Sequence, residues 1–153
     1  MAKSNLTEED TKNRYITPAI EKAGWAKSQC FMEYYFTDGQ ILIRGDVVKR
    51  AESKKADYLL VTKEGNKPLA VVEAKSIGKS ISDGMQQAIE YAKILDVPFA
   101  YSSNGEGFIE HDMLNGTEKE LKMSDFPSEY ELWNRYKAHH NIDKHEEEII
   151  KKP

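Results

Sequence analysis

The sequence predicts a single α/β domain in which a mixed β-sheet is flanked by helices. Two helical apolar patterns, in residues 7–22 and 82–95, alternate with short strand-like runs. The run Leu69–Val72 is apolar at every position, which is typical of a central strand buried on both faces. The order strand, helix, strand over residues 69–102 predicts two parallel strands joined by a right-handed crossover.

The first predicted helix spans Thr7–Lys22. Thr7 and Asp10 have the spacing of a capping box at its start, and Gly24 is typical of a residue that ends a helix. Pro18 interrupts the pattern, so we expect a kink or a division into two helices at this point.

Strand-like segments follow this helix. The aromatic run Phe31–Phe36 precedes Asp38-Gly39, a pair that favours a tight turn, and it is therefore predicted to form a hairpin with Gln40–Val48. The segment Lys49–Lys55 is interpreted as a charged connector. The remaining predicted elements are strands Ala56–Thr62, Leu69–Ala74, Phe99–Ser102 and Phe108–His111, and helices Ser82–Leu95 and Glu129–Lys137.

Composition limits the class of protein. The length of 153 residues fits one domain, and a single cysteine, Cys30, excludes a disulfide framework and a four-cysteine zinc site. We find no apolar run long enough to span a membrane and no secretory signal, so a cytoplasmic protein is expected. Apolar residues become scarce after Asn141, which predicts a domain over residues 1–140 and a tail or linker over 141–153.

Charge is distributed unevenly along the chain. The formal net charge is −4, yet residues 44–79 hold nine Lys/Arg against five Asp/Glu. This excess indicates either a local binding site for a polyanion or a solvated lysine-rich surface. The candidates for contact with a phosphate backbone are Lys49, Arg50, Lys54, Lys55 and Lys79. The acidic residues Glu110, Asp112 and Glu118 are interpreted as a solvated face.

A constellation of polar residues stands at the end of the predicted central strand. Glu73 and Lys75 are two positions apart, so their side chains project from one face of the strand. Asp57 begins the preceding strand and can enter the same cleft if the two strands are neighbours. Two adjacent carboxylates repel each other unless a divalent cation joins them, and all-oxygen ligands favour Mg²⁺. A lone Glu-x-Lys is more often a surface ion pair, but this set indicates metal-assisted hydrolysis of a phosphodiester.

This arrangement resembles the PD-(D/E)xK nuclease signature, with Ala56-Asp57 in place of Pro-Asp and Glu73-Ala74-Lys75 as the second element. Gln87 and Tyr91, one helical turn apart, resemble the Gln-x-x-x-Tyr motif of RecB-like nucleases and type I restriction endonucleases. Roughly residues 6–138 are similar to the N-terminal domain of the type I restriction (R) subunit. The segments that carry this similarity include Ala23-Gly24-Trp25, Lys55–Leu60, Ala100–Gly105 and Glu131-Leu132-Trp133.

The resemblance implies a restriction-endonuclease-like three-layer core and an endonuclease that acts on double-stranded DNA. It implies Asp57 and Glu73 as ligands of Mg²⁺, with Mn²⁺ also accepted, and Lys75 as the catalytic lysine. Glu8, or alternatively Glu9, would hold a metal-bound water. Gln87 and Tyr91 would position the DNA or that water. The partners that the resemblance implies are the modification and specificity subunits and a helicase-like motor region. ATP would act only through that motor region.

Two other classes of function remain open. The domain could be a non-catalytic docking module that keeps a nuclease fold, or a stand-alone repair nuclease. An ATP-binding loop at Gly78-Lys79-Ser80 is excluded, because the required glycine five residues before Gly78 is Glu73. Lys79 is therefore interpreted as a contact to the DNA backbone or as a solvated side chain.

Overall fold

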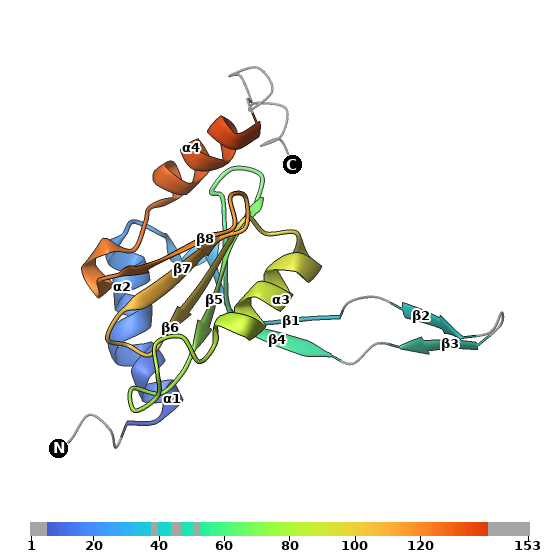
Figure 1. Ribbon diagram of the computed structural model, residues 1–153, viewed down its shortest axis with the longest axis horizontal. Coiled ribbons are helices and arrows are strands. Elements are labelled where there is room, and N and C mark those ends of the chain that lie inside the picture. Colours follow the sequence, from blue (N-terminus) through green and yellow to red (C-terminus); the bar gives the residue numbers. More distant parts are fainter. Residues whose placement is uncertain (1–5, 38–39, 44–46, 51–52, 141–153) are drawn as a thin grey trace.

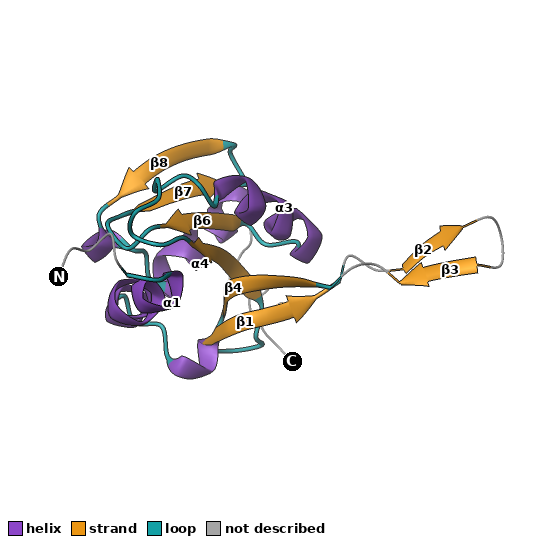
Figure 2. Ribbon diagram, turned by 90° about the horizontal axis from the view of Figure 1, so that it is seen from below, coloured by secondary structure: helices purple, strands orange, loops and turns teal. Residues whose placement is uncertain are grey.

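The computed structural model describes residues 6–37, 40–43, 47–50 and 53–140. Its middle layer is a six-stranded sheet with the strand order β1-β4-β5-β6-β7-β8 (Figure 1). These strands are β1 (Cys30–Phe36), β4 (Lys54–Val61), β5 (Pro68–Ala74), β6 (Phe99–Ser103), β7 (Phe108–Asp112) and β8 (Thr117–Leu121). A second sheet contains β2 (Gln40–Ile43) and β3 (Val47–Arg50) and stands apart from the first (Figure 2). The predicted tail, 141–153, lies outside the described residues.

Helices cover both faces of the six-stranded sheet. They are α1 (Glu8–Thr11), α2 (Thr17–Lys22), α3 (Met85–Leu95) and α4 (Glu129–His140), with a π-helical turn at Lys12–Ile16 and short 3-10 turns at Lys27–Gln29 and Met123–Asp125. On one face, Ile20 and Leu132 pack with Tyr58. On the other face, Ala88 of α3 packs with Leu59 and Val71. The two clusters form a three-layer α/β core, which confirms the predicted fold class.

The sheet is mixed, as predicted. Strands β5 and β6 are parallel, with Val72 paired to Tyr101, and α3 connects them. The other neighbouring strands of this sheet are antiparallel. The parallel pair places the ends of β5 and β6 at the same edge of the sheet.

The predicted hairpin between Phe31–Phe36 and Gln40–Val48 is wrong. Strand β1 pairs with β4, for example Met32 with Tyr58, whereas β2 pairs with β3. Pairing with a central strand lets Tyr34 and Phe36 pack against the α3 side of the core, which a locally closed hairpin would not provide. The connector predicted at Lys49–Lys55 is also wrong, because its two ends belong to β3 and β4.

Strand β8 was not predicted. Four of its five residues are exposed, so it carries no alternating apolar pattern. It forms because the preceding strand β7 offers a full ladder of backbone partners, from Phe108↔Leu121 to Asp112↔Thr117.

The capping box at the first helix is confirmed. Thr7 Oγ1 accepts a hydrogen bond from the Asp10 N–H at 3.0 Å, and the Asp10 carboxylate accepts one from the Thr7 N–H at 3.2 Å. The predicted interruption is found as the π-helical turn between α1 and α2. Pro18 lies in the first turn of α2, and the π-helical turn ends two residues before it, at Ile16.

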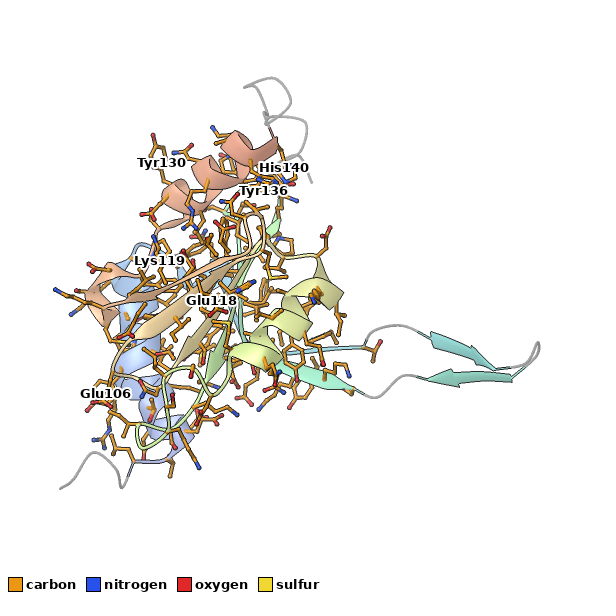
Figure 3. The ribbon with its side chains drawn as sticks, in the orientation of Figure 1. Glu106, Glu118, Lys119, Tyr130, Tyr136 and His140 are labelled. Atoms are coloured by element: carbon orange, nitrogen blue, oxygen red, sulfur yellow. The ribbon has the colours of Figure 1, made fainter. Side chains whose placement is uncertain are left out.

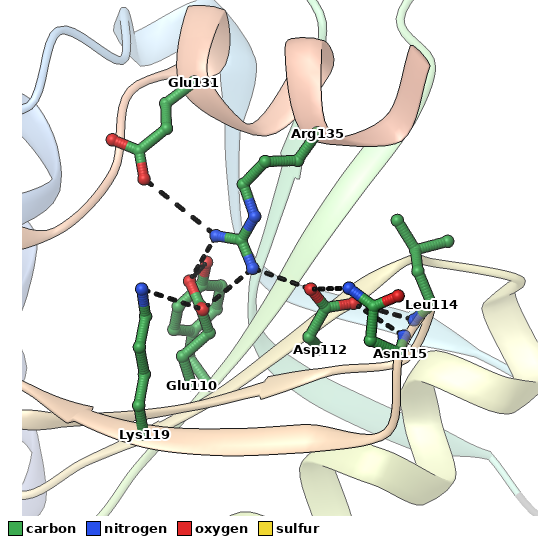
Figure 4. A network of polar contacts seen from close by, with 8 residues as sticks. Glu110, Asp112, Leu114, Asn115, Lys119, Glu131 and Arg135 are labelled. Atoms are coloured by element: carbon green, nitrogen blue, oxygen red, sulfur yellow. Dashed lines mark hydrogen bonds and ion pairs between the residues drawn. The ribbon is translucent and has the colours of Figure 1, made fainter. Parts of the chain in front are cut away.

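Arg135 fastens α4 to the sheet (Figure 4). Its guanidinium donates two hydrogen bonds of 3.0 Å to Glu110 and one of 2.8 Å to Asp112. The Tyr101 hydroxyl donates to Glu110 at 2.7 Å, and the guanidinium carbon lies 4.6 Å from the centre of the Phe99 ring. The prediction of a solvated acidic face is therefore wrong for Glu110 and Asp112, which are buried because Arg135 neutralises them.

An aromatic stripe continues along α4. The Tyr136 and Trp133 rings stack with their centroids 5.3 Å apart, and the centroids of the Tyr136 and His140 rings are 4.3 Å apart. Figure 3 labels Tyr136 and His140 on this helix. These spacings of three and four residues bring the three rings to one side of the helix. None of the helices in the described part of the chain is long and apolar enough to cross a membrane.

Candidate active site

The two predicted metal ligands meet where β4 and β5 separate. The paired register of these strands ends at Tyr58↔Val72. Beyond it, the Asp57 N–H donates to Glu73 Oε2 at 2.9 Å, and the Ala74 N–H donates to Asp57 Oδ2 at 2.8 Å. Side-chain carboxylates thus replace backbone carbonyls as acceptors for buried N–H groups. We refer to these two hydrogen bonds as the reciprocal clamp. Through this clamp, the backbone of β4 holds the Glu73 side chain, and the backbone of β5 holds the Asp57 side chain.

Burial makes this acid pair electrostatically costly. Asp57 and Glu73 are only 5% and 3% exposed. Desolvation, reinforced by the charge of Asp57, raises the pKa of Glu73 to about 8. The pair is therefore suited to bind a cation or a shared proton.

A cavity of about 480 Å³ opens over the acid pair. It is lined by Glu8, Ser53, Lys54, Lys55, Asp57, Glu73, Ala74, Lys75, Gln87, Glu90 and Tyr91. The structure therefore brings together all six predicted catalytic residues and two of the five predicted DNA-contacting residues. Ser53 and Glu90 were not predicted, because an exposed serine or glutamate in a polar segment carries no distinguishing sequence signal.

Lys75 remains on the same side as Glu73 because strand pairing continues past the end of β5. The Lys75 N–H donates to the Ser103 carbonyl at 2.8 Å. The Lys75 side chain therefore lines the cavity beside Glu73, as the alternation of strand residues predicts.

Glu8, rather than Glu9, faces the cavity. Burial and the charge of Asp57 raise the pKa of Glu8, while Lys75 and Lys12 oppose this shift. The Glu9 side chain is 61% exposed and does not line the cavity. Of the two acids that the sequence left open, the geometry favours Glu8.

Gln87 and Tyr91 form the wall of the cavity on α3. Gln87 Nε2 donates to the Tyr91 hydroxyl at 2.7 Å. The Tyr91 ring meets Phe36 edge to face at 5.0 Å, so it is also part of the core. Burial and the nearby charge of Glu73 raise the pKa of the Tyr91 hydroxyl.

Close packing at Gly84 sets α3 against the acid pair. A methyl group at Gly84 would lie 3.0 Å from Ser102 Oγ and 3.2 Å from Glu73 Cβ. The Gly84 N–H donates to Ser102 Oγ at 3.1 Å, and that hydroxyl donates to the Ile81 carbonyl at 2.8 Å. The start of α3 is thus tied to β6, which holds Gln87 and Tyr91 at the cavity.

The remaining predicted DNA contacts lie away from this cavity or outside the description. Lys79 is exposed and does not line the cavity. Lys49 and Arg50 belong to β3, but their side chains lie outside the described part of the structure. Lys55 is at the rim, with its ammonium 3.5 Å from Glu33 Oε1.

The raised pKa of Glu73 predicts a pH-dependent stability in the absence of metal. The folded chain holds the Glu73 proton up to about pH 8, whereas the unfolded chain releases it near pH 4.5. Between these values the folded state binds more protons, so this group makes the free energy of unfolding fall as the pH rises. Glu73→Gln stays neutral and keeps an acceptor for the Asp57 N–H. We expect it to be more stable than the parent chain by about 2 kcal/mol or more at pH 8.5 and to match it more closely at pH 5.

Urea unfolding in the presence of a chelator, at pH 5 and pH 8.5, measures this difference. Glu64→Gln, at an exposed position, is the matched control and should leave the pH dependence unchanged. An equal pH dependence for the parent chain and Glu73→Gln would contradict the prediction.

A mixed sheet between helical layers and a pair of buried acids at its separated strands define a restriction-endonuclease-like α/β domain. The sequence profile of the family described as the type I restriction enzyme R protein N terminus matches residues 7–127. The chain belongs to this family.

Two relatives illustrate the similarity. The type I restriction enzyme EcoAI endonuclease subunit of Escherichia coli is 45% identical over an alignment of 138 residues. The match covers 87% of this chain and 17% of that protein. A solved fragment assigned to an HsdR subunit of a type I restriction enzyme from Vibrio vulnificus YJ016 superposes with a TM-score of 0.77 at 41% identity. The match covers 91% of this chain and 27% of the solved one. The chain thus spans a minor part of the length of both relatives.

Proposed function

We propose that this chain is the Mg²⁺-dependent DNA endonuclease domain of a type I restriction-modification R subunit and hydrolyses phosphodiester bonds with metal-activated water. The observation that carries this proposal is the reciprocal clamp, which fixes two buried acids beneath a cavity that Lys75 also lines. The family supports the assignment, because the Escherichia coli relative is named as an endonuclease subunit.

Asp57 and Glu73 fit the requirements of Mg²⁺. Among the described residues, no three His, Cys, Asp or Glu side chains form a group that could hold a metal ion. Mg²⁺ needs only one or two carboxylates because it keeps several of its waters, and Mn²⁺ takes the same oxygen ligands. When bound, such an ion supplies an activated water and offsets phosphate charge.

The other residues of the cavity have separate roles in this proposal. The Lys75 ammonium would orient the attacking water and balance the charge of the scissile phosphate. Gln87 and Tyr91, already joined by a hydrogen bond, would position the DNA backbone. Glu8, which also lines the cavity, would accept a hydrogen bond from a water in it.

Contacts to DNA would extend from the rim of the cavity. Lys54 and Lys55 line it and are suited to phosphate oxygens. We assign Lys49, Arg50 and Lys79 the same role. Phosphate contacts position a duplex without reading its sequence. In this proposal, recognition belongs to the modification and specificity subunits, and ATP acts through a helicase-like motor region.

Replacing Lys75 by methionine tests the catalytic role. We expect Lys75→Met to slow Mg²⁺-dependent cleavage at least about a hundredfold, because it removes a positive charge aimed at the developing charge of the phosphate. The measurement is the linearisation of plasmid DNA by the assembled restriction enzyme that contains this chain.

Lys93→Met removes an exposed lysine from the far end of α3 and should cleave at the parental rate. If Lys75→Met folds and also cleaves at the parental rate, the nuclease proposal is wrong. A non-catalytic docking module would then be the better interpretation.

A further inference from the structure

A buried lysine lies behind the acid pair. The Lys12 side chain is only 2% exposed, although lysine is almost never buried without a partner. Its ammonium lies 3.8 Å from Asp57 Oδ1 and 4.0 Å from Glu9 Oε1, and 5.5 Å from the centre of the Tyr58 ring. Lys12 does not line the cavity, and its proximity to the Tyr58 ring places it on the face of the sheet where Ile20 and Leu132 pack.

The irregular first helix delivers Lys12 to this position. Lys12 opens the π-helical turn, whose last residue, Ile16, is fully buried in the core. A π-helical turn contains an additional residue, which changes the direction of the side chains that precede it relative to those that follow. Lys12 also lies one turn after Glu8, so both residues project toward Asp57 from one side of the helix. Glu8 lines the cavity, whereas Lys12 does not.

The Asp57 carboxylate is therefore held on both of its oxygens. Oδ2 accepts the Ala74 N–H in the reciprocal clamp, and Oδ1 faces the Lys12 ammonium. We propose that Lys12 is a positioning residue that gives Asp57 a permanent counter-charge, so that the acid pair folds without a bound metal. The proposal rests on the metal site proposed above and extends it to the regulation of metal affinity.

A fixed positive charge behind Asp57 has two consequences of opposite sign. It stabilises the metal-free fold, because it compensates the buried carboxylate of Asp57. It also weakens the attraction of the site for a divalent cation, because like charges repel. Lys12 thus raises the stability of the metal-free chain and lowers its affinity for the metal.

The test compares Lys12→Met, which removes the charge, with Lys12→Arg, which keeps it. Thermal unfolding in chelator and in Mn²⁺, together with calorimetric titration of Mn²⁺ alone, is carried out on this chain. We expect Lys12→Met to unfold about 5–10 °C lower in chelator, to recover more of its Tm in Mn²⁺ than the parent chain does, and to bind Mn²⁺ about threefold to tenfold more tightly. Lys12→Arg should restore the parental Kd, and Lys22→Met, at an exposed position, should change neither quantity.

The outcomes separate the two proposals. The metal site itself is wrong if the parent chain does not bind Mn²⁺, or if Asp57→Asn leaves that binding unchanged. The proposed role of Lys12 fails with it. If the parent chain binds Mn²⁺ but Lys12→Met binds it equally or more weakly, the proposed role of Lys12 alone is wrong. If Lys12→Met and Lys12→Gln both fold only in Mn²⁺, the proposal is supported. If neither variant folds even in Mn²⁺, Lys12 is merely structural and the proposal is overturned.

Discussion

Asp57→Asn is expected to reduce metal-dependent DNA cleavage at least about a thousandfold, because it removes one of two carboxylates that would hold the ion. The asparagine oxygen can still accept the Ala74 N–H, but the buried Lys12 ammonium loses its counter-charge, so we expect the variant to fold with a lower Tm than the parent chain. Plasmid cleavage by the assembled enzyme measures the loss, and calorimetric titration of this chain with Mn²⁺ should show that binding is lost with it.

Asp125→Asn is the matched control. Asp125 is exposed in a 3-10 turn and does not line the cavity, so cleavage and metal binding should stay at parental levels. Parental cleavage by a folded Asp57→Asn variant would contradict the assignment of Asp57. Thermal unfolding of both variants distinguishes a chemical loss from a failure to fold.

Arg135→Met is expected to destabilise the domain by about 3–5 kcal/mol, because it leaves two buried carboxylates without their cation. Glu110 and Asp112 are 2% and 4% exposed, and both accept hydrogen bonds from Arg135 (Figure 4). Burial alone would raise the pKa of Asp112, but the hydrogen bond and charge of Arg135 hold it below the ordinary value. Urea unfolding at neutral pH measures the destabilisation.

Neutralising the acids in the same chain should reverse part of this loss. Adding Glu110→Gln and Asp112→Asn to Arg135→Met removes the buried negative charges, so stability should recover partially. Lys119→Met is the control, because the Lys119 ammonium lies 3.9 Å from Glu110 but the side chain is 59% exposed. Its expected cost is below about 1 kcal/mol. Equal losses for Arg135→Met and Lys119→Met would contradict the role of Arg135.

The sequence predicted the strands that carry the acids because their local patterns agree with their burial. The apolar run before Glu73 indicates a central strand, and the motif spacing places Asp57 beside it. The capping box at Thr7 was predictable because it is formed within four residues. In each case the information is local and the tertiary structure reinforces it.

The features that escaped prediction depend on contacts between distant segments. The partner of β1 was mistaken because the Asp38-Gly39 turn signal is local, whereas β4 becomes a neighbour only after folding. Lys12 and Arg135 are charged residues in charged segments, and only the folded structure places Asp57 or Glu110 against them. Their burial is a consequence of paired charges, which composition does not reveal.

The reciprocal clamp restricts which side chains evolution can place at the two acid positions. Each acid accepts a backbone hydrogen that has no other strand to bond to at this point of the sheet. An aliphatic replacement would orphan an amide in the interior, whatever the fate of the chemistry. A lineage that no longer cleaves DNA would therefore still need asparagine or glutamine at positions 57 and 73. The fold, and not catalysis, would then keep these positions polar.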